Sequence, residues 1–175
     1  YRTAQTQAVM SEFMAASLLY RSDWYRKLRT SIEEGAAEGP VLLDPFCGSG
    51  TICIEAALMA TNTAPGLLKQ DSFAFLGLPI HDEELWQETV AEAQAQRREN
   101  TCRIIGWDID RRAVDISTEN ARKAGLEGMV EFAVRDFTTV TEADVPLQAD
   151  ASSPTRPTAC AWTAARPRSD VFTPP

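Results

Sequence analysis

Residues 42–51 read LLDPFCGSGT, and the pattern of this stretch decides the fold. The apolar run at 41–44 follows a proline and is typical of a short buried strand in a parallel sheet. Residues 51–60, TICIEAALMA, are apolar almost all round, which predicts a buried helix. Gly48 and Gly50 allow a sharp turn between the two elements and the close approach of a ligand. The stretch therefore predicts a strand, a tight turn and a helix whose N-terminus faces a binding site.

The segments on either side of this stretch continue the alternation of helices and strands. The expected elements are helices over 7–20 and 23–31, an irregular segment over 61–81, a helix from 82 to about 99, a strand over 103–108, a helix over 111–124 and a strand over 129–134. In the first helix, Val9, Phe13, Ala16 and Leu19 recur at helical spacing. This order predicts an α/β fold, the N-terminal half of a doubly wound, Rossmann-like parallel sheet that is incomplete. Without later strands, the strand at 41–44 would form an exposed apolar edge.

The composition is that of a soluble globular domain with an acidic balance. The chain has 175 residues and a formal net charge of −8, whereas a free-standing nucleic-acid binder would show a basic face. If RNA is the substrate, another domain must supply most of the phosphate contacts. No apolar run approaches the length of a membrane helix. The four cysteines form no CxxC pair, and together with the single histidine they make no plausible set of zinc ligands. We interpret them as reduced thiols of a cytoplasmic protein: Cys47, Cys53, Cys102 and Cys160.

Two common nucleotide-binding motifs do not match the glycine turn. A phosphate-binding GxxxxGK[ST] loop requires a lysine, and none stands there. A dinucleotide GxGxxG fingerprint requires a third glycine, but Cys53 occupies that position. Asp44, directly before the turn, would repel a phosphate. It suits a ligand with a cationic end, such as the amino group of S-adenosylmethionine.

Two more acidic residues follow the later strands. Asp108 ends the second strand, where a carboxylate can hold both ribose hydroxyls, although it could also serve only as a helix cap, a role for which Asp110 is the better candidate. Asp136 follows the third strand and could meet an adenine amine or be a loop acid without a ligand. Phe137 could flank the adenine ring or belong to the core. Since parallel strands end at one edge of the sheet, we expect the three acids to line one crevice.

Three other residues stand outside the ends of the predicted strands. His81 precedes the cap at 82 and is interpreted as structural, with no catalytic role. Trp86 lies on a predicted helix face, where packing is a better interpretation than base stacking. Glu55 is unusual inside an apolar helix, and it could bond a loop amide or line the site.

Several motifs resemble those of a known enzyme family. They are DPFCGSGTICIEAALMA (44–60), APGL (64–67), IHDEELW (80–86), GWDID (106–110) and ENARKAGL (119–126). The first resembles the opening motif of class I S-adenosylmethionine-dependent methyltransferases. The insert with APGL and HDEELW narrows the resemblance to THUMP-linked RNA guanine-N2 methyltransferases that act on large-subunit ribosomal RNA. The resemblance covers residues 1 to about 140.

The resemblance implies S-adenosylmethionine as cofactor and assigns residues to it. The residues around its methionine end would be Asp44, Phe46, Gly48, Ser49, Gly50 and Thr51. Asp108, with Ile109 beside it in the GWDID motif, would hold the ribose. Asp136 and Phe137 would meet the adenine. The resemblance implies neither a bound metal ion nor association with a membrane. It implies that the protein contacts ribosomal RNA, in preference to transfer RNA, through an upstream THUMP-type domain.

The catalytic motif of the resembled family, Asn-Pro-Pro-Tyr followed by Gly, does not occur in this chain. In that family the Asn side chain and a Pro carbonyl accept hydrogen bonds from the base amine, and the Tyr stacks on the flipped base. No catalytic residue is therefore assigned, and we expect this chain to be inactive.

The stretch ASSPTRPTACAWT (151–163) stands where the missing motif is expected. Read one base earlier, with Ser as TCN and Arg as CGN, the codons of this stretch are compatible with two apolar residues followed by Ala-Asn-Pro-Pro-Tyr-Gly-Met-Arg-Leu-Asp. The resembled family commonly continues NPPYG with x-Arg-Leu. The hypothesis is that the reading frame changes between about 137 and 151.

The expected organisation has three parts. Residues 1–34 form a helical linker from an upstream domain, residues 35–140 the cofactor-binding half of a methyltransferase domain, and residues 141–175 an irregular, out-of-frame tail. Two alternatives stay open: an NPPY-type DNA or protein N-methyltransferase, and a non-catalytic nucleotide-binding module. A dehydrogenase is the weakest alternative because of Cys53.

Overall fold

A computed structural model describes residues 10–141 and 144–145 of the chain. In chain order its elements are α1 (Glu12–Tyr20), α2 (Asp23–Glu33), β1 (Leu42–Asp44), α3 (Thr51–Ala60), the 3-10 segments η1 (Pro65–Ser72) and η2 (Ala74–Gly77), α4 (Glu83–Ala95), β2 (Ile104–Asp108), α5 (Arg111–Lys123), β3 (Val130–Val134) and η3 (Phe137–Thr139). The stretch 151–163 and most of the predicted tail lie outside the described residues.

The three strands form one parallel sheet in the order β1-β2-β3. Asp44 is level with Gly106, and Asp108 is level with Val134. This arrangement confirms the predicted α/β fold with a partial parallel sheet. Among the described residues β1 pairs only with β2, so its backbone lies at an edge, but its side chains are buried, with Leu42 at 0% and Leu43 at 6% exposure.

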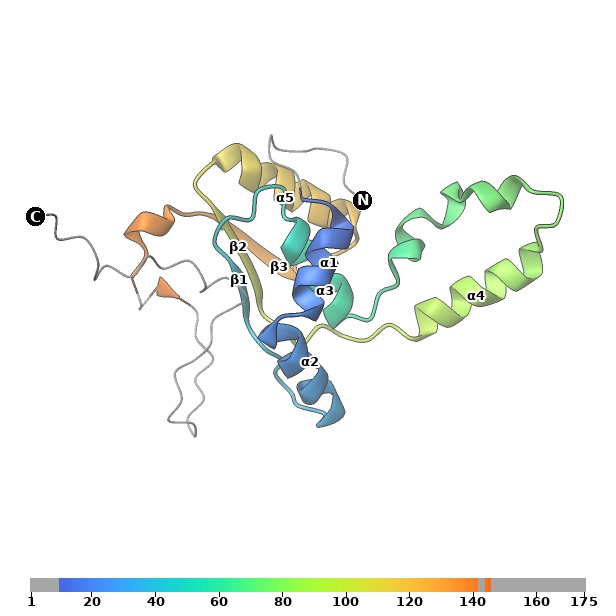
Figure 1. Cartoon of the computed structure of the whole chain (residues 1–175), viewed down its shortest axis with the longest axis horizontal. Coiled ribbons are helices and arrows are strands. Elements are labelled where there is room, and N and C mark those ends of the chain that lie inside the picture. Colours follow the sequence, from blue (N-terminus) through green and yellow to red (C-terminus); the bar gives the residue numbers. More distant parts are fainter. Residues whose placement is uncertain (1–9, 142–143, 146–175) are drawn as a thin grey trace, which may run out of the picture.

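Helices cover one face of the sheet (Figure 1). On that face Leu42, Ile104 and Phe132 pack with apolar residues of α3 and α5, and α1 and α2 lie against the same core. The opposite face carries Leu43, Ile105 and Trp107, which pack against partly buried apolar residues: Val41, Ala133, Val140 and Val145. The predicted buried helix at 51–60 is confirmed, since eight of its residues are buried.

Element boundaries differ from the predicted ones by two residues or more in three helices. The first begins at Glu12, because the Ser11 hydroxyl caps it by accepting a hydrogen bond from the Met14 amide. Its buried residues are Ala15 and Leu19, so the prediction for Leu19 is confirmed, whereas the prediction for Phe13 is wrong, with Phe13 81% exposed. Val9 lies outside the described residues. A helix that is apolar all round carries no periodicity from which its buried face could be read. The second helix extends to Glu33 instead of 31, and α4 ends at Ala95 instead of about 99.

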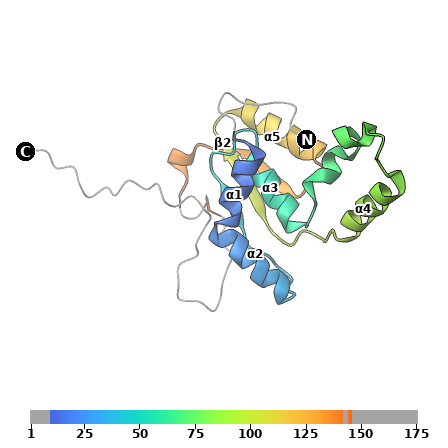
Figure 2. The same cartoon turned by 45° about the vertical axis from the view of Figure 1, so that its right-hand side comes forward.

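Residues 64–95, which contain η1, η2 and α4, form an arm that projects from the body (Figure 2). Its root is closed by hydrogen bonds between the segments 59–63 and 96–98. The Arg98 amide donates to the Thr61 carbonyl, the Arg98 guanidinium to the carbonyls of Ala60 and Met59, and the Asn62 side chain to the Gln96 carbonyl. The segment 61–81, predicted to be irregular, contains the two 3-10 segments η1 and η2 and leads into α4.

The described part of the chain holds three cysteines, Cys47, Cys53 and Cys102, all buried and free. This agrees with the interpretation of these three as reduced thiols. None of the helices in the described part is both long enough and apolar enough to span a membrane.

Candidate functional site

The predicted site residues gather where the parallel strands end. Asp44 is the last residue of β1 and Asp108 the last residue of β2, whereas Asp136 stands two residues beyond the end of β3. Asp44 and Asp108 are close enough for the second carboxylate to raise the pKa of the first. The structure therefore brings two of the three predicted acids together at one edge of the sheet and places the third on the segment that follows β3.

The turn between β1 and α3 is held by backbone hydrogen bonds. The Gly50 amide donates to the Cys47 carbonyl at 2.8 Å, and the Cys47 amide donates to the Trp107 carbonyl at 2.8 Å. Gly48 has φ 54° and Gly50 has φ 79°, values in the left-handed region that favour glycine. Gly50 is the N-cap of α3 and provides no side-chain cap, so the first turn of this helix opens directly from the glycine turn.

Asp108 links the turn to β2. Its Oδ2 accepts a hydrogen bond from the Gly48 amide at 2.9 Å, and its Oδ1 accepts one from the Asp110 amide at 3.0 Å. Asp110 caps α5, since its Oδ1 accepts a hydrogen bond from the Arg112 amide at 2.9 Å. The preference for Asp110 as the cap is confirmed, and the interpretation of Asp108 as only a helix cap is wrong. Each carboxylate oxygen of Asp108 keeps a further lone pair with which it can accept another hydrogen bond.

Asp44 is a buried carboxylate in an unfavourable environment. It is 8% exposed, and its Oδ1 accepts a hydrogen bond from the Phe46 amide at 3.1 Å. Burial, which disfavours the charged form, raises the pKa of Asp44 from 3.8 to about 6, and the nearby Asp108 carboxylate adds to this shift. A cationic group placed beside Asp44 would offset both effects.

Cys47, between the two acids, is not a candidate nucleophile. Its thiol is buried, and burial together with the charges of Asp44 and Asp108 raises its pKa to about 12. Ser49 and Thr51 are also buried, and their hydroxyls lie 3.3 Å apart. These side chains therefore support the turn from inside the protein, and a ligand at this edge would meet mainly the backbone of the turn.

Three apolar side chains stand exposed at the same edge. Phe46 is 63% exposed, Ile109 is 67% exposed and Phe137 is 46% exposed. The rings of Phe46 and Phe137 meet edge to face, with centroids 5.2 Å apart. Phe137 is thus not a core residue, and the pair joins the ends of β1 and β3. Exposed aromatic side chains beside polar groups are typical of ligand sites.

Asp136 is exposed and caps the short segment η3. Its Oδ1 accepts hydrogen bonds from the Thr138 amide at 2.9 Å and from the Thr138 hydroxyl at 2.6 Å. These bonds lower the pKa of Asp136. Within the described residues, the hydrogen bonds of Asp136 are those of a loop acid that caps a short helix. Its contact with a ligand stays a prediction.

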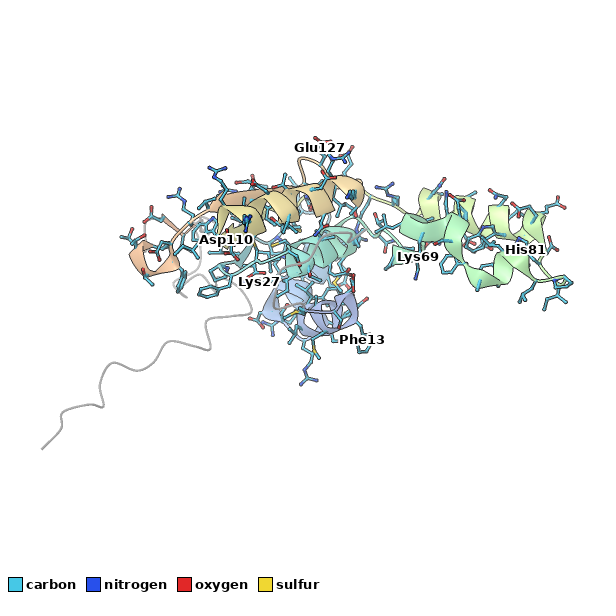
Figure 3. All side chains as sticks on the ribbon, turned by 90° about the horizontal axis from the view of Figure 1, so that it is seen from above. Phe13, Lys27, Lys69, His81, Asp110 and Glu127 are labelled. Atoms are coloured by element: carbon cyan, nitrogen blue, oxygen red, sulfur yellow. The ribbon has the colours of Figure 1, made fainter. Side chains whose placement is uncertain are left out.

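The structure gives other neighbours to Glu55, His81 and Trp86. Glu55 is buried and lines two cavities of about 340 and 590 Å³ that border α1 and residues 62–69. His81 contacts Glu83 at 2.9 Å, and Figure 3 shows it on the arm, at the opposite end of the molecule from Asp110. Trp86 packs edge to face on Phe73 and Phe75, which confirms the packing interpretation.

The sequence patterns missed the residues that support the turn from below. A Cβ at Gly106 would lie 2.6 Å from the Phe132 ring, and a Cβ at Gly50 would lie 2.8 Å from the Ser117 Cβ and 2.9 Å from Phe132. Gly50 is therefore required by internal packing as well as by its backbone angle. A glycine inside the strand IIGWD was the available signal, since glycine in a strand often marks a close approach.

The acids and aromatic rings at this edge fit a cationic, aromatic ligand. Residues 42–51 and 104–110 contain no lysine or arginine, so they present no cation for a phosphate. A buried carboxylate, a second carboxylate with free lone pairs and three exposed apolar side chains match a ligand with an ammonium group, a ribose and a base. Among the described residues there is no group of three or more His, Cys, Asp or Glu that could hold a metal ion.

Comparison with known proteins gives one consistent family. Residues 1–149 match the family model described as RMKL-like, methyltransferase domain. The ribosomal RNA large subunit methyltransferase K/L of Allochromatium vinosum is 41% identical over 140 residues, which are 78% of this chain and 18% of that protein. The protein of the same name from Shewanella baltica is 41% identical over 145 residues, 81% of this chain and 19% of that protein. This chain thus spans about a fifth of the length of these relatives.

Solved structures show the same fold. The protein SMU.472, described as a methyltransferase and complexed with SAH, matches with a TM-score of 0.66 and 35% identity, over 81% of this chain and 34% of that one. A protein from Listeria monocytogenes described as an N6-adenine-specific DNA methylase matches with a TM-score of 0.65 and 32% identity, over the same shares of the two chains.

Proposed function

Because this chain belongs to the family of RMKL-like methyltransferase domains, we propose that its carboxyl edge binds S-adenosylmethionine for methyl transfer to guanine N2 in large-subunit ribosomal RNA. The observation that carries the cofactor assignment is the pairing of a buried carboxylate, Asp44, with the exposed ring pair Phe46 and Phe137 at one edge. The SAH-bound structural neighbour and the names of the curated relatives support it.

Asp44 and the turn after it would hold the methionine end. The charge of the cofactor's ammonium group would compensate for the burial of the Asp44 carboxylate. The carboxylate end would lie against the backbone of Gly48, Ser49, Gly50 and Thr51, at the N-terminus of α3, where the N–H groups of Gly48 and Gly50 already bond Asp108 and Cys47. The cofactor, when bound, supplies a methyl group on a positively charged sulfur.

The other half of the cofactor would lie across β2 and β3. The lone pairs of Asp108 that its two backbone bonds leave free would accept hydrogen bonds from the ribose hydroxyls. Phe46, Ile109 and Phe137 would flank the adenine ring and exclude water from it. Asp136 would accept a hydrogen bond from the adenine amine through the oxygen that does not bond Thr138.

We also propose that this chain is itself inactive and that its reading frame changes before residue 151. The family match ends at residue 149, two residues before ASSPTRPTACAWT, and no Asn-Pro-Pro-Tyr occurs anywhere in the chain. Without that motif no residue of this chain would hold the base amine against the methyl group. Sequencing the encoding DNA tests this idea, and the absence of any single-base change that restores NPPYG would rule it out.

The proposed organisation follows from the same family relationship. Residues 1–34 would connect to an upstream THUMP-type domain, residues 35–140 would bind the cofactor, and residues 141–175 would be out of frame. With a net charge of −8, the chain would rely on other parts of the polypeptide for its RNA contacts, and it would work in the cytoplasm.

Two measurements test the proposed activity. Calorimetric titration of this chain with S-adenosylhomocysteine should give saturable binding, and no heat at high protein concentration would contradict the cofactor assignment. The frame-restored full-length protein should then place a methyl group on guanine N2 of ribosomal RNA, which mass spectrometry of the digested nucleosides detects.

A second candidate is methylation of adenine N6 in DNA. The Listeria monocytogenes neighbour described as such an enzyme favours it, at 32% identity. The same nucleoside analysis separates the two, because a methylated deoxyadenosine from DNA and an unmodified guanosine from RNA would establish this alternative.

A further inference from the structure

Asn120 is a fully buried amide side chain that contacts the glycine turn. It lies in α5 with 0% exposure, and its Nδ2 donates a hydrogen bond to the Ser49 carbonyl at 3.1 Å, across 71 positions of sequence. A buried amide is unfavourable unless its polar atoms are hydrogen-bonded. The bond to Ser49 therefore gives a reason for an asparagine inside this helix.

This hydrogen bond acts on a single peptide plane. The Ser49 carbonyl and the Gly50 N–H belong to the same planar peptide group. The Gly50 N–H donates to the Cys47 carbonyl at 2.8 Å, so both polar ends of this plane are held. The turn itself holds the N–H end, and α5 holds the carbonyl end.

The plane needs to be held because glycines surround it. Gly48 and Gly50 both have positive φ, and glycine has more accessible backbone conformations than any other residue. Gly50 also gives α3 no side-chain cap. The direction of the N–H groups at the start of α3 therefore depends on the orientation of the Ser49–Gly50 peptide.

The two halves of the turn are fixed from different elements. Strand β2 holds the first half, through the Trp107 carbonyl that accepts from the Cys47 amide and the Asp108 carboxylate that accepts from the Gly48 amide. Helix α5 holds the second half through Asn120. Packing adds to this support, since Ser117 and Phe132 fill the space next to Gly50.

We propose that Asn120 is a positioning residue for cofactor binding, which keeps the Ser49–Gly50 peptide in the orientation that receives the methionine end. This inference rests on the proposed function, because it takes the turn to be part of the cofactor site. Asn120 bonds the turn through the Ser49 carbonyl and, at 0% exposure, would not contact the ligand itself.

The main test compares Asn120→Leu with Thr61→Val in the whole 175-residue chain. The Leu variant keeps about the size of the side chain and removes the donor without adding a charge or another donor. The control removes a buried hydroxyl at the C-terminal end of α3, which donates to the Ala57 carbonyl, and it also keeps the size of the side chain. Calorimetry with S-adenosylhomocysteine should give a Kd about tenfold higher for Asn120→Leu, the loss expected for one hydrogen bond to a buried carbonyl, and a Kd within about twofold of the parent for Thr61→Val.

A second readout separates positioning from general destabilisation. In spectra of the ¹⁵N-labelled free proteins, Asn120→Leu should shift the amide resonances of Ser49 and Gly50, and the parent protein should show slow exchange of the Gly50 amide. Equal weakening of binding by the two variants, or a Gly50 amide that exchanges rapidly in the folded parent, would overturn the inference. If Asn120→Leu does not fold, the exchange rate of the Gly50 amide in the parent protein decides alone. If the parent protein does not bind S-adenosylhomocysteine, the result counts against the proposed function. The amide measurements would still test whether Asn120 fixes the Ser49–Gly50 peptide.

Discussion

The glycine turn and the projecting arm show two opposite ways in which a loop joins a strand and a helix. In the turn, residues 44–51, all positions except Pro45, Phe46 and Gly48 are buried, and β2 and α5 both bond its backbone. In the arm, residues 64–95, only Val90 is buried, and hydrogen bonds to the body are concentrated at the root. The turn is therefore specified by long-range contacts, and the arm by contacts within itself.

The two regions should differ in their tolerance to change. A buried turn that two other elements bond has no room for a new atom, because protein interiors are close-packed. An arm whose contacts are mostly internal can lose them without disturbing the sheet, since stability is distributed unevenly over a structure. Six substitutions, in four predictions, test this contrast, from the largest expected effect to the smallest.

The largest effect is expected from a methyl group added to the turn. Gly50→Ala would place a Cβ 2.8 Å from Ser117 and 2.9 Å from Phe132, at a residue with φ 79°. Overpacking and left-handed strain together should lower the free energy of unfolding by about 3–4 kcal/mol. Denaturant unfolding monitored by circular dichroism measures the change.

The matched glycine in the arm is Gly77. Nothing lies within 4 Å of the position that its Cβ would take, and its φ is not positive. Gly77→Ala should therefore leave the free energy of unfolding within about 0.5 kcal/mol or raise it slightly. Equal losses in the two variants would show that the turn is no more tightly packed than the arm.

The same contrast explains what could be predicted from sequence. The strand at 42–44, the glycine turn and the helix at 51–60 carry their signals within a few consecutive residues, and the structure confirms them almost to the residue. The Asp110 and Asp82 caps are local signals of the same kind and are also confirmed. Local patterns report local hydrogen bonds, so they were sufficient here.

Contacts between distant residues could not be predicted. The bond from Asn120 to Ser49 joins positions 71 apart, and the fit of Phe132 against Gly50 and Gly106 depends on how β3 and α5 pack. No local pattern reports either contact. The prediction that Phe13 is buried failed for a related reason. When a helix is apolar on all sides, its neighbours in the fold decide which face is buried, and the helix sequence alone does not show it.

The second prediction concerns the charge of Asp44. Since its pKa rises from 3.8 to about 6 on folding, the folded state holds more protons than the unfolded state between these pH values. The contribution of Asp44 to the free energy of unfolding therefore falls as pH rises from about 4 to 6, and above pH 6 it stays unfavourable by about 3 kcal/mol at most. Asp44→Asn, which keeps an acceptor for the Phe46 amide, should raise the stability of the free protein at pH 7 by about 2–3 kcal/mol and little at pH 4.

Cofactor binding should respond in the opposite direction. The Asn variant lacks the charge that would face the ammonium group, so its affinity for S-adenosylhomocysteine should fall while its stability rises. Thermal unfolding at pH 4 and pH 7, with calorimetry at pH 7, measures both quantities. A variant less stable than the parent at pH 7 would mean that Asp44 already has a favourable partner in the free protein.

The third prediction is a local loss in the arm. Trp86 packs on Phe73 and Phe75 with ring centroids 5.6 and 5.1 Å apart, and these three rings link α4 to the 3-10 segments. Trp86→Ala should destabilise the arm by about 2 kcal/mol, less than for a fully buried tryptophan because Trp86 is only half-buried. Limited proteolysis should then cleave within residues 64–95 several times faster and leave the sheet intact. Faster cleavage in β1 or α3 as well would show that the arm and the body unfold together.

The smallest effect on stability is expected where apolar side chains are exposed in both regions. Phe46 is 63% exposed beside the turn, and Ile80 is 88% exposed on the arm. Phe46→Ser and Ile80→Ser should each change the free energy of unfolding by about 0.5 kcal/mol or less, because neither side chain is in the core. Their effects on binding should differ, since only Phe46 meets another ring, that of Phe137, at the edge where the acids gather. Titration with S-adenosylhomocysteine should show about a tenfold loss of affinity for Phe46→Ser, from the loss of an aromatic contact, and none for Ile80→Ser. If the two substitutions leave affinity equally unchanged, the exposure of Phe46 has no more functional meaning than that of Ile80, and the adenine would have to lie elsewhere.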